Sequence, residues 1–384
     1  MLIDTDQQFV AFLERCKKSP YIAIDTEFLR EKTYYPKLCL LQMGIENEIA
    51  IVDPFKIRNL AALADVLVDP SIVKIFHACS QDVEILYHET GVVPSPIFDT
   101  QIAAAVLGKT QQASYSSLVS QYCDVNLPKK DSFTDWSQRP LSDSQIHYAA
   151  DDVKYLPQIY YEMLAQLKKK NRLSWLEETF ADLSKKEKYE IDPRVRYKKL
   201  KRVNQLNARQ QAAAREFAAW RELQAQRLNI PRKWVVSDEQ IVEACRREAR
   251  TLDELYMVRG MKESLKTSDA RKVLAALIVG LDCPQSELPD VRPKSKNENN
   301  VDVILDVMNA LVRMRAREHE IAPQTLAPQA ELLKLARGHY DDSELMQGWR
   351  YTLVGKDLRT LLEGGFALQI HDGNLEIISL HEAQ

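Results

Sequence analysis

The sequence lacks long apolar runs. No stretch approaches the roughly 20 consecutive apolar residues that a transmembrane helix needs. Residues 1–20 carry acids early and contain no apolar core flanked by small residues, so we expect no secretory signal. These two absences argue against an integral membrane protein and against a secreted one.

The sequence also lacks paired cysteines and a net charge that would favour binding to nucleic acid. Its six cysteines are scattered, without a CxxC pair or a histidine-rich partner segment, which argues against a zinc module or a disulfide framework. Reduced thiols suit the cytoplasm, where we expect this protein to be located. Because the formal net charge is −3, a surface that binds a polyanion would require local clustering of basic residues.

The N-terminal part alternates short apolar, β-branched runs with polar turns or helical patterns, which predicts an α/β domain. The predicted strands lie at 21–25 (YIAID), 38–44 (LCLLQMG), 48–53 (EIAIVD) and 73–77 (VKIFH). Three runs in quick succession imply hairpins, so the sheet should be mixed rather than purely parallel.

A helical pattern replaces these runs after Pro140. Ser142 followed by Gln145 is a capping-box signature, and apolar residues continue at helical spacing to Leu156. Beyond residue 160, few strands are predicted until the final residues. We divide the chain into a catalytic-type domain at 1–170, a connector at 171–205, helical blocks at 206–283 and 301–384, and a linker at 284–300.

The connector contains a basic cluster at 185–202. Its basic residues are Lys185, Lys186, Lys188, Arg194, Arg196, Lys198, Lys199, Lys201 and Arg202, against three acids. Affinity for an RNA backbone is largely electrostatic, so this cluster is consistent with phosphate contacts. A solvated charge run without a ligand is the alternative.

Two acids, Asp25 and Glu27, stand at the end of an apolar strand and are separated by one residue. Side chains at i and i+2 of a strand point to the same face. Two such carboxylates repel each other and are costly to bury without a cation. The pair therefore indicates a metal site, although strand ends also carry solvated acids before a turn.

Two later segments supply further acids. Asp82 follows the strand at 73–77 and, with Ser80 as a helix N-cap, falls in the first helical turn, where an acid also complements the helix dipole. Tyr148 and Asp152 are four residues apart and share one face of a predicted helix, although a surface tyrosine beside acids is the alternative. Asp151 lies about 100° around that helix, so we do not expect it on the same face.

Together the motifs run in the order DxE on a strand, Asp at a helix start and YxxxD on a later helix. This order resembles the DEDD exonuclease superfamily, in the branch whose third motif carries tyrosine. Longer segments are similar to the bacterial ribonuclease D family: DTEF, YYPKLCLLQ, HACSQDVEIL, FDTQIAA, KKDSFTDWSQRPL and HYAADDVKYLP. The resemblance continues into the C-terminal half and covers essentially the whole chain.

The resemblance implies a ribonuclease-H-like α/β catalytic domain with two divalent ions, Mg²⁺ or Mn²⁺. Asp25, Glu27, Asp82 and Asp152 match the family's four metal ligands, and Tyr148 matches the tyrosine that orients the attacking water. Hard dications prefer carboxylate oxygens, and two of them about 4 Å apart can activate water and stabilise the leaving oxygen. Since the pKa of tyrosine is about 10, its expected role is positioning rather than proton abstraction.

The implied activity is 3′→5′ hydrolysis of RNA to 5′-mononucleotides, with transfer-RNA precursors as substrates. A DNA exonuclease of the same superfamily is an alternative, because recognition of the sugar needs contacts to the 2′-hydroxyl that a sequence does not show. A catalytically silent RNA-binding scaffold is another, and the presence of all four acids with Tyr148 argues against it. We expect a monomer, because the sequence has no long heptads or dedicated interface signal.

Six further residues are candidate substrate contacts: Phe28, His77, Lys129, Lys130, Trp136 and Arg139. Phe28 could pack on the terminal nucleotide or belong to the core, and His77 could contact that nucleotide or simply end a strand. The segment 129–141 could offer phosphate and stacking contacts, or form a loop anchored by a buried Trp136. Asp99, in FDT, is interpreted as structural and not as a metal ligand.

The two helical blocks complete the resemblance. In the first block, Trp220, Arg221, Pro231 and then Ser237 before a new helix are similar to the HRDC domain of ribonuclease D and RecQ-type helicases. This similarity implies nucleic-acid binding. The second block shows a weaker form of the same helical pattern, which predicts a second, diverged all-α HRDC-like domain. A scaffolding or protein-contact role is the alternative for both.

Overall fold

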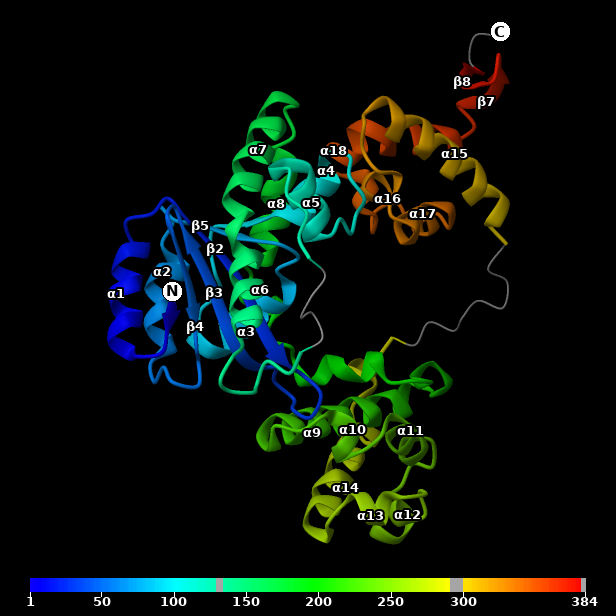
Figure 1. Ribbon diagram of the computed structural model, residues 1–384. Helices are drawn as coiled ribbons and strands as arrows, with labels where there is room; N and C mark the ends of the chain where they lie inside the picture. Colours follow the sequence, from blue (N-terminus) through cyan, green and yellow to red (C-terminus); the bar gives the residue numbers. More distant parts are fainter. Residues whose placement is uncertain (129–133, 291–299, 381–384) are drawn as a thin grey trace.

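The computed structural model describes residues 1–128, 134–290 and 300–380. Within these ranges the chain forms an N-terminal α/β domain and two helical bodies, and each body has an apolar core of its own (Figure 1). The predicted order of one α/β domain followed by helical domains is therefore confirmed. No helix in the described ranges has the length and apolar character that crossing a membrane requires.

The N-terminal domain is built on a six-stranded sheet with the order β1-β4-β3-β2-β5-β6. Its strands are β1 (Leu2–Ile3), β2 (Tyr21–Leu29), β3 (Lys37–Ile45), β4 (Glu48–Val52), β5 (Val73–Phe76) and β6 (Ile97–Asp99). Strands β2, β3 and β4 form successive antiparallel pairs, whereas β1, β5 and β6 are joined to the sheet in parallel. The prediction of a mixed sheet is confirmed.

Strand β2 is longer than the sequence pattern predicts. It continues past Asp25 to Leu29, because β3 still pairs with this segment, with a register shift between Glu27 and Phe28. The two acids therefore lie inside a strand and not at its end. The short strands β1 and β6 were not predicted, because two or three residues are too few to show an alternating pattern.

The alternating side chains of β2 show how helices cover both faces of the sheet. Ile22 and Ile24 belong to the core beside α1 (Asp6–Cys16), α2 (Ala64–Val68) and α3 (Ser80–Thr90). Tyr21 and Ala23 pack on the opposite face with Val153 of α6 (Asp143–Lys154), which α7 (Leu156–Lys169) follows. Odd-numbered residues of β2 therefore face α6, and even-numbered residues face α3. Three further helices complete this domain: α4 (Thr100–Val106), α5 (Tyr115–Cys123) and α8 (Ser174–Leu183).

The first helical body surrounds the long helix α9 (Ala208–Leu228). It also contains α10 (Arg232–Val235), α11 (Asp238–Arg246), α12 (Leu252–Tyr256), α13 (Met261–Ser264) and α14 (Thr267–Leu281). Helices α9 and α14 approach closely at Gly280, where a Cβ atom would lie 2.4 Å from the Cα of Ala213. Ser237 caps α11 with a capping box, as its position before a new helix predicted.

The second helical body ends in a β-hairpin. Its helices are α15 (Asp302–Glu318), α16 (Pro323–Leu326), α17 (Gln329–Ala336), α18 (Gly348–Arg350) and α19 (Lys356–Leu362), with a π-helical turn at Tyr351–Gly355. Strands β7 (Phe366–His371) and β8 (Asn374–Ser379) then form an antiparallel pair. The helical prediction for this block is confirmed up to the final residues, where the strands replace an all-α structure.

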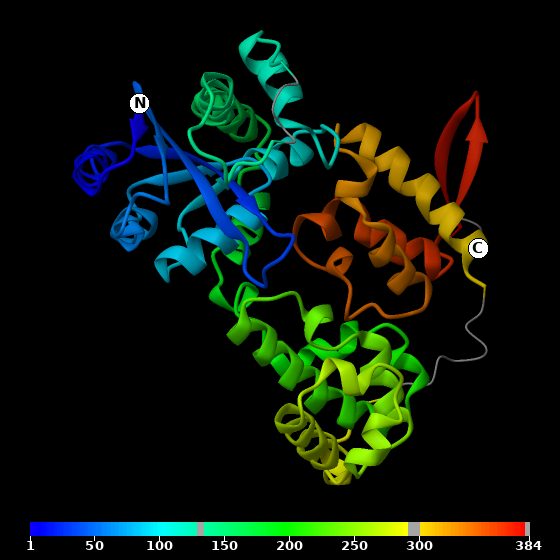
Figure 2. The ribbon, with the colours of Figure 1, turned by 60° about the horizontal axis from the view of Figure 1, so that its bottom comes forward.

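The first helical body contacts the loop that joins β2 to β3 (Figures 1 and 2). The hydroxyl of Tyr34 donates a hydrogen bond of 2.5 Å to Oε1 of Glu222, on α9. The side-chain oxygen of Asn229, which ends α9, accepts from the backbone N–H groups of Tyr34 and Tyr35 at 3.1 Å each. The loop that follows β2 is therefore held by α9.

The second helical body contacts the N-terminal domain near α4 and α8. The guanidinium of Arg172 donates to the carbonyl oxygens of Val106 at 2.9 Å and Glu320 at 3.3 Å, and so joins the two bodies. The indole rings of Trp175 and Trp349 stack with centroids 4.6 Å apart and an interplanar angle of 7°. Both helical bodies are thus attached to the catalytic-type domain by polar and aromatic contacts.

Candidate active site

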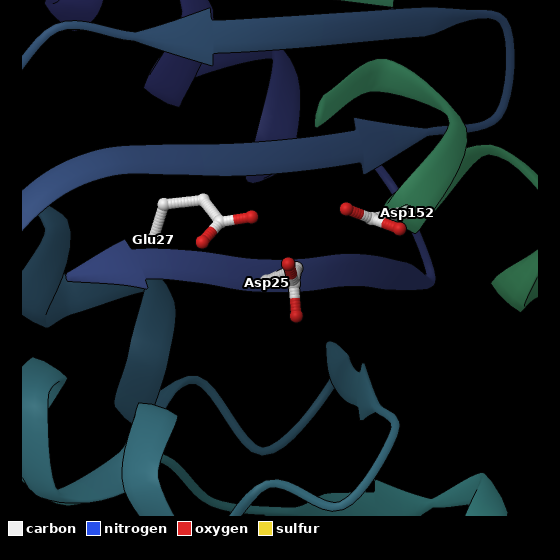
Figure 3. A group of neighbouring side chains, drawn as sticks. All are labelled: Asp25, Glu27 and Asp152. Carbon is white, nitrogen blue, oxygen red and sulfur yellow. The ribbon is translucent and has the colours of Figure 1, made fainter. Parts of the chain in front are cut away.

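Three carboxylates converge on the face of the sheet that α6 covers (Figure 3). Asp25 and Glu27 come from odd positions of β2, and Asp152 comes from α6. One carboxylate oxygen from each residue lies within 4.8 Å of the others, so the three could hold a metal ion. The i, i+2 spacing on β2 and the packing of α6 on that face together produce this group.

Helix α6 is held in place by its cap and by its buried face. The Ser142 hydroxyl accepts from the backbone N–H of Gln145, and the Gln145 side chain accepts from the Ser142 N–H, which confirms the predicted capping box. Ala149 and Val153 are fully buried against the sheet. Asp152, next to this buried face, is therefore directed along the sheet surface towards β2.

Tyr148 lies one helical turn before Asp152, and both side chains line a small hollow of about 150 Å³. Leu127, Pro128 and His147 line the same hollow, with Ser144 and Asp151. The ring of Tyr148 also packs beside the indole of Trp136, with centroids 5.9 Å apart. This arrangement brings a phenol and a carboxylate to one surface, as the YxxxD spacing predicts.

Asp82 does not join the three-carboxylate group in this structure. It lies in the first turn of α3, only 7% exposed, and its Oδ1 accepts a hydrogen bond of 2.5 Å from the hydroxyl of Thr26. Thr26 occupies an even position of β2, so its side chain points to the α3 face. The structure therefore brings together three of the four predicted ligands and places the fourth beside them, on the other side of the strand.

The start of α3 differs from the prediction by one residue. Cys79 and not Ser80 is the N-cap, and no side chain of α3 caps the helix. Instead, the buried carboxylate of Asp99 accepts from the backbone N–H groups of Ala78 and Cys79, and also from those of Gln101 and Ile102 at the start of α4. Asp99 thus has the structural role that the sequence suggested, because it satisfies the exposed N–H groups of two helix starts.

Burial raises the pKa values of all four acids, because the charged form is poorly solvated. The pKa of Glu27 rises to about 8, and those of Asp82 and Asp152 rise to about 7. Burial also raises the pKa of Asp25 well above its ordinary value, and repulsion from the neighbouring carboxylates adds to this effect. Positive charge nearby would favour their deprotonation at neutral pH.

Neighbouring basic side chains do not supply that charge. Arg30 is paired with Glu84 at 2.7 Å, and Lys154 is 3.9 Å from Asp151. In the described part of the chain, Asp25, Glu27 and Asp152 take part in no ion pair with a lysine or arginine. A cluster of oxygen ligands without a protein cation suits a hard divalent ion, because such ions bind carboxylate oxygens.

We expect the metal-free protein to lose stability as the pH rises from about 4, the ordinary pKa of these acids, to about 8, the pKa of Glu27 in the folded protein. A carboxylate whose pKa is higher in the folded state than in the unfolded chain stabilises the fold below its unfolded pKa, and this contribution disappears as pH passes the folded pKa. Divalent metal binds the deprotonated form, so its stabilising effect should grow with pH. Thermal unfolding in EDTA and in Mg²⁺, at about pH 6 and about pH 9, measures this difference. An equal rise in Tm at both pH values would contradict the expectation.

Among the weaker candidates, Phe28 and His77 are both partly buried near the acids. Phe28 packs against the main core of the domain. The Nδ1 atom of His77 lies 2.9 Å from the hydroxyl of Thr100, and its ring is 5.7 Å from the ring of Tyr115. Burial lowers the pKa of His77. The contacts of Phe28 agree with a core residue, and those of His77 agree with a histidine that ends a strand and is satisfied by protein groups.

The loop before α6 is anchored by Trp136 and Arg139. Trp136 is 3% exposed, so its ring is covered by protein and could not stack on a base in this conformation. Arg139 donates to both carboxylate oxygens of Asp53 at 2.8 Å and to the carbonyl of Cys39 at 2.8 Å. These contacts match the buried-anchor alternative, and we leave both residues out of the substrate contacts proposed below. Lys129 and Lys130 lie outside the described residues.

Two site residues were missed in the sequence. Thr26 lies between the paired acids and holds Asp82, and the alternation of β2 could have placed it towards α3. Tyr115 contacts His77, and its hydroxyl donates to the backbone carbonyl of Asp151. Nothing local in the sequence indicates this second contact, because it depends on how α5 packs beside α6.

Comparisons with known proteins agree with this geometry. The model of a 3′-5′ exonuclease family matches residues 1–168, and the model of the HRDC domain matches residues 210–277. Ribonuclease D of Sphingobium indicum is 37% identical over 380 residues, covering 98% of both chains. Ribonuclease D of Acidiphilium cryptum is 35% identical over 382 residues, covering 99% of this chain and 97% of the relative.

A solved structure extends the similarity to the whole fold. The crystal structure of Escherichia coli RNase D, described as an exoribonuclease involved in structured RNA processing, superposes with a TM-score of 0.81. Its sequence is 29% identical, and the match covers 95% of this chain and 98% of the solved one. The similarity therefore includes the α/β domain and both helical bodies.

Proposed function

This chain belongs to the ribonuclease D family, and from that premise we propose its substrates, its metal stoichiometry and the roles of its active-site residues. The protein is a 3′→5′ exoribonuclease of the DEDD superfamily, whose members depend on divalent metal. The observation that supports the proposed site best is the group of three carboxylates within 4.8 Å, with Asp82 adjacent. The proposed reaction is hydrolysis of RNA from its 3′ end to 5′-mononucleotides.

We assign two divalent ions, Mg²⁺ or Mn²⁺, to the four acids. Asp25, Glu27 and Asp152 would supply oxygens from the α6 side of β2, and Asp82 would supply one from the α3 side. The residues fit this role, because burial and mutual repulsion raise their pKa values, and a divalent ion bound to their oxygens would offset both effects. Thr26 keeps the Asp82 carboxylate oriented through its hydrogen bond.

When bound, such ions lower the pKa of an attacking water and stabilise the leaving 3′ oxygen. Tyr148 would hold that water by a hydrogen bond from the same helix face as Asp152. A phenol with an ordinary pKa of about 10 remains protonated at neutral pH, so it orients the water without removing its proton. The hollow beside Tyr148 and Asp152 would leave room for the attacking water next to both groups.

The proposed substrates are transfer-RNA precursors and other RNAs with structured parts and extended 3′ ends. The E. coli relative is described as an exoribonuclease involved in structured RNA processing, and this chain matches it over both helical bodies. The first helical body, matched by the HRDC model, is the proposed RNA-binding domain, and the second is proposed to be a diverged copy. We propose a cytoplasmic monomer.

A direct assay tests the activity and the substrate together. The protein is incubated with a 3′-extended precursor RNA and with DNA of the same sequence, in Mg²⁺, in Mn²⁺ and in EDTA. We expect 5′-mononucleotides from RNA in either metal and no product in EDTA. Internal fragments or activity in EDTA would overturn the mechanism, and faster degradation of DNA would overturn only the substrate.

Replacement of Tyr148 by Phe is expected to lower kcat by about 10-fold to 100-fold and to leave KM nearly unchanged. The change removes one hydrogen bond to a reacting group, worth about 1.5–3 kcal/mol, and preserves the ring that packs on Trp136. Steady-state kinetics on a short RNA measures both constants, with Tyr161→Phe, an exposed tyrosine of α7, as the control. A rise in KM at constant kcat would indicate substrate binding instead.

A further inference from the structure

The structure divides the basic cluster of the connector into two halves. The first half uses its charges within the protein: Lys185 and Lys188 pair with Asp182, Lys186 with Glu190, Arg194 with Glu216, and Arg196 with Glu222. These residues hold the connector against α8 and α9. Their charges are therefore already compensated.

The second half consists of Lys198, Lys199, Lys201 and Arg202, which we call the basic turn. All four side chains are exposed. Within the described ranges none of them forms an ion pair, in contrast to every basic residue of the first half. Three neighbouring residues anchor the backbone of the turn, because Tyr197, Leu200 and Val203 are buried in the core of the first helical body. Four uncompensated cations thus project from a fixed backbone.

The basic turn stands between two clefts. Lys199 lines a cleft of about 520 Å³ that separates the first helical body from the catalytic domain, together with Lys233, Arg232 and Arg30. Glu31 and Asp238 are the acids that line it, and Asp238 is paired with Arg221 at 2.7 Å. Among the described residues that line this cleft, Lys199 and Lys233 are the cations outside ion pairs and Glu31 is the acid, so the remaining charge is positive.

This first cleft ends beside the elements that carry the catalytic acids. Arg30 follows β2 directly, three residues after Glu27, and its guanidinium pairs with Glu84, two residues after Asp82 on α3. A strand of RNA lying in the cleft would consequently reach the end of β2 and the α3 side of that strand, where Asp82 lies.

The second cleft, of about 530 Å³, crosses the surface of the first helical body. Lys201 and Arg202 line it with Arg246 and Arg259. Its acids are Glu239 and Glu243, and Glu243 pairs with both Arg246 and Arg247. The basic turn therefore joins a surface of the helical body to the approach to the catalytic domain.

An exposed aromatic ring lies next to this path. Trp234 follows Lys233 on α10 and is 54% exposed, although tryptophan is normally a well-buried residue. Proteins that bind single-stranded nucleic acid combine a cationic groove with aromatic rings on which bases stack. Lys233 lines the first cleft, and Trp234 is its neighbour on α10, so a cation and an exposed ring are adjacent in the chain at this point.

We propose that the basic turn, with Lys233 and Trp234, binds the single-stranded 3′ segment of the RNA substrate and directs it along the first cleft towards the active site. This inference rests on the proposed function. Phosphates would contact Lys198, Lys199, Lys201, Arg202 and Lys233, and one base would stack on Trp234. The catalytic acids bind only the terminal phosphodiester, so the turn would supply affinity for longer RNA.

The test neutralises the turn in the full-length protein. A quadruple variant, K198Q/K199Q/K201Q/R202Q, is compared with a control that removes the same charge from remote, exposed positions, K18Q/R58Q/K168Q/K169Q. Affinity for a fluorescent single-stranded RNA is measured by anisotropy in EDTA over a range of salt concentrations. We expect the turn variant to bind about 10-fold to 100-fold more weakly, and its slope of log affinity against log salt to become shallower by about 3, since each phosphate contact contributes about 0.7.

A second pair of variants tests the stacking contact. Trp234→Ala should weaken RNA binding about tenfold, whereas Trp234→Phe should retain most of the affinity, because the ring is preserved. Leu223→Ala, at a side chain 55% exposed on α9, is the matched control for loss of an exposed apolar group and should bind as the unmodified protein does.

The outcomes separate this inference from the proposed function. If the unmodified protein does not hydrolyse RNA in Mg²⁺, the proposed function fails whatever the turn binds. If it hydrolyses RNA, but the turn variant and its control have the same affinity and salt slope, the inference is overturned, and the turn would serve another partner. The ratio of kcat/KM for a long RNA to that for a dinucleotide should fall in the turn variant and stay constant in the control.

Discussion

Replacement of Asp25 by Asn is expected to lower the turnover of RNA on the order of 10³-fold. Asp25 lies in the middle of the carboxylate group, between Glu27 on the same strand and Asp152 on α6. Loss of one charged ligand weakens divalent-metal binding, which supplies several kcal/mol of transition-state stabilisation, and each 1.4 kcal/mol corresponds to a tenfold change in rate. Single-turnover hydrolysis of a short 3′-labelled RNA in Mg²⁺ measures the effect.

The same substitution should not destabilise the metal-free fold. Burial and mutual repulsion raise the pKa of Asp25, so a neutral amide of similar shape relieves an unfavourable charge. Tm in EDTA at about pH 8 should therefore stay constant or rise, which separates loss of chemistry from loss of folding. Asp143→Asn, an exposed acid of the same chemical type on α6, is the control and should keep nearly full activity. An active Asp25→Asn protein would remove Asp25 from the metal site.

Replacement of Glu222 by Ala is expected to destabilise the first helical body by about 2–3 kcal/mol. Glu222 is completely buried, and its carboxylate accepts from Arg196 at 2.8 Å, Arg232 at 2.5 Å and Tyr34 at 2.5 Å. Burial opposes its ionisation, but these donors hold the pKa of Glu222 below the ordinary value. Removal of Glu222 leaves Arg196 unpaired with only 13% of its side chain exposed, whereas Arg232, at 40%, can be hydrated, so the penalty stays below that of a fully buried pair.

The loss should also loosen the contact between the helical body and the catalytic domain, because Tyr34 lies in the loop after β2. Urea unfolding followed by circular dichroism measures the destabilisation as an earlier helical transition. Glu222→Gln should have a smaller effect, since the amide oxygen still accepts hydrogen bonds. Glu239→Ala, an exposed acid of the same body, is the control. Unfolding of Glu222→Ala at the same urea concentration as the unmodified protein would contradict this role.

Local chemistry made several parts of this protein predictable. The alternation of β2 puts Asp25 and Glu27 on one face whatever the rest of the fold does. The capping box at Ser142 fixes the start of α6. Within this helix, the four-residue spacing places Tyr148 and Asp152 on one face. Both features depend only on residues near one another in the chain.

Other features depend on contacts between distant segments. Sequence could not decide between a stacking and a buried Trp136, because its burial results from packing against β3, β4 and α6. It placed Ser80 at the N-cap of α3, whereas Asp99, 20 residues after Cys79, satisfies that helix start. The extension of β2 to Leu29 likewise depends on its partner strand β3.

The sequence by itself determined which acids are present and which of them share one face of a strand or helix, since these periodicities follow from the backbone. Only the tertiary structure decided which groups meet: Asp25, Glu27 and Asp152 converge, and Asp82 lies next to this group with its carboxylate bonded to Thr26. It also decided which cations are uncompensated, because Lys185 to Arg196 find acids on α8, α9 and neighbouring turns, whereas Lys198 to Arg202 find none among the residues that the structure describes. A charge becomes available to a ligand only where folding brings no opposite charge to it, and that depends on the whole chain.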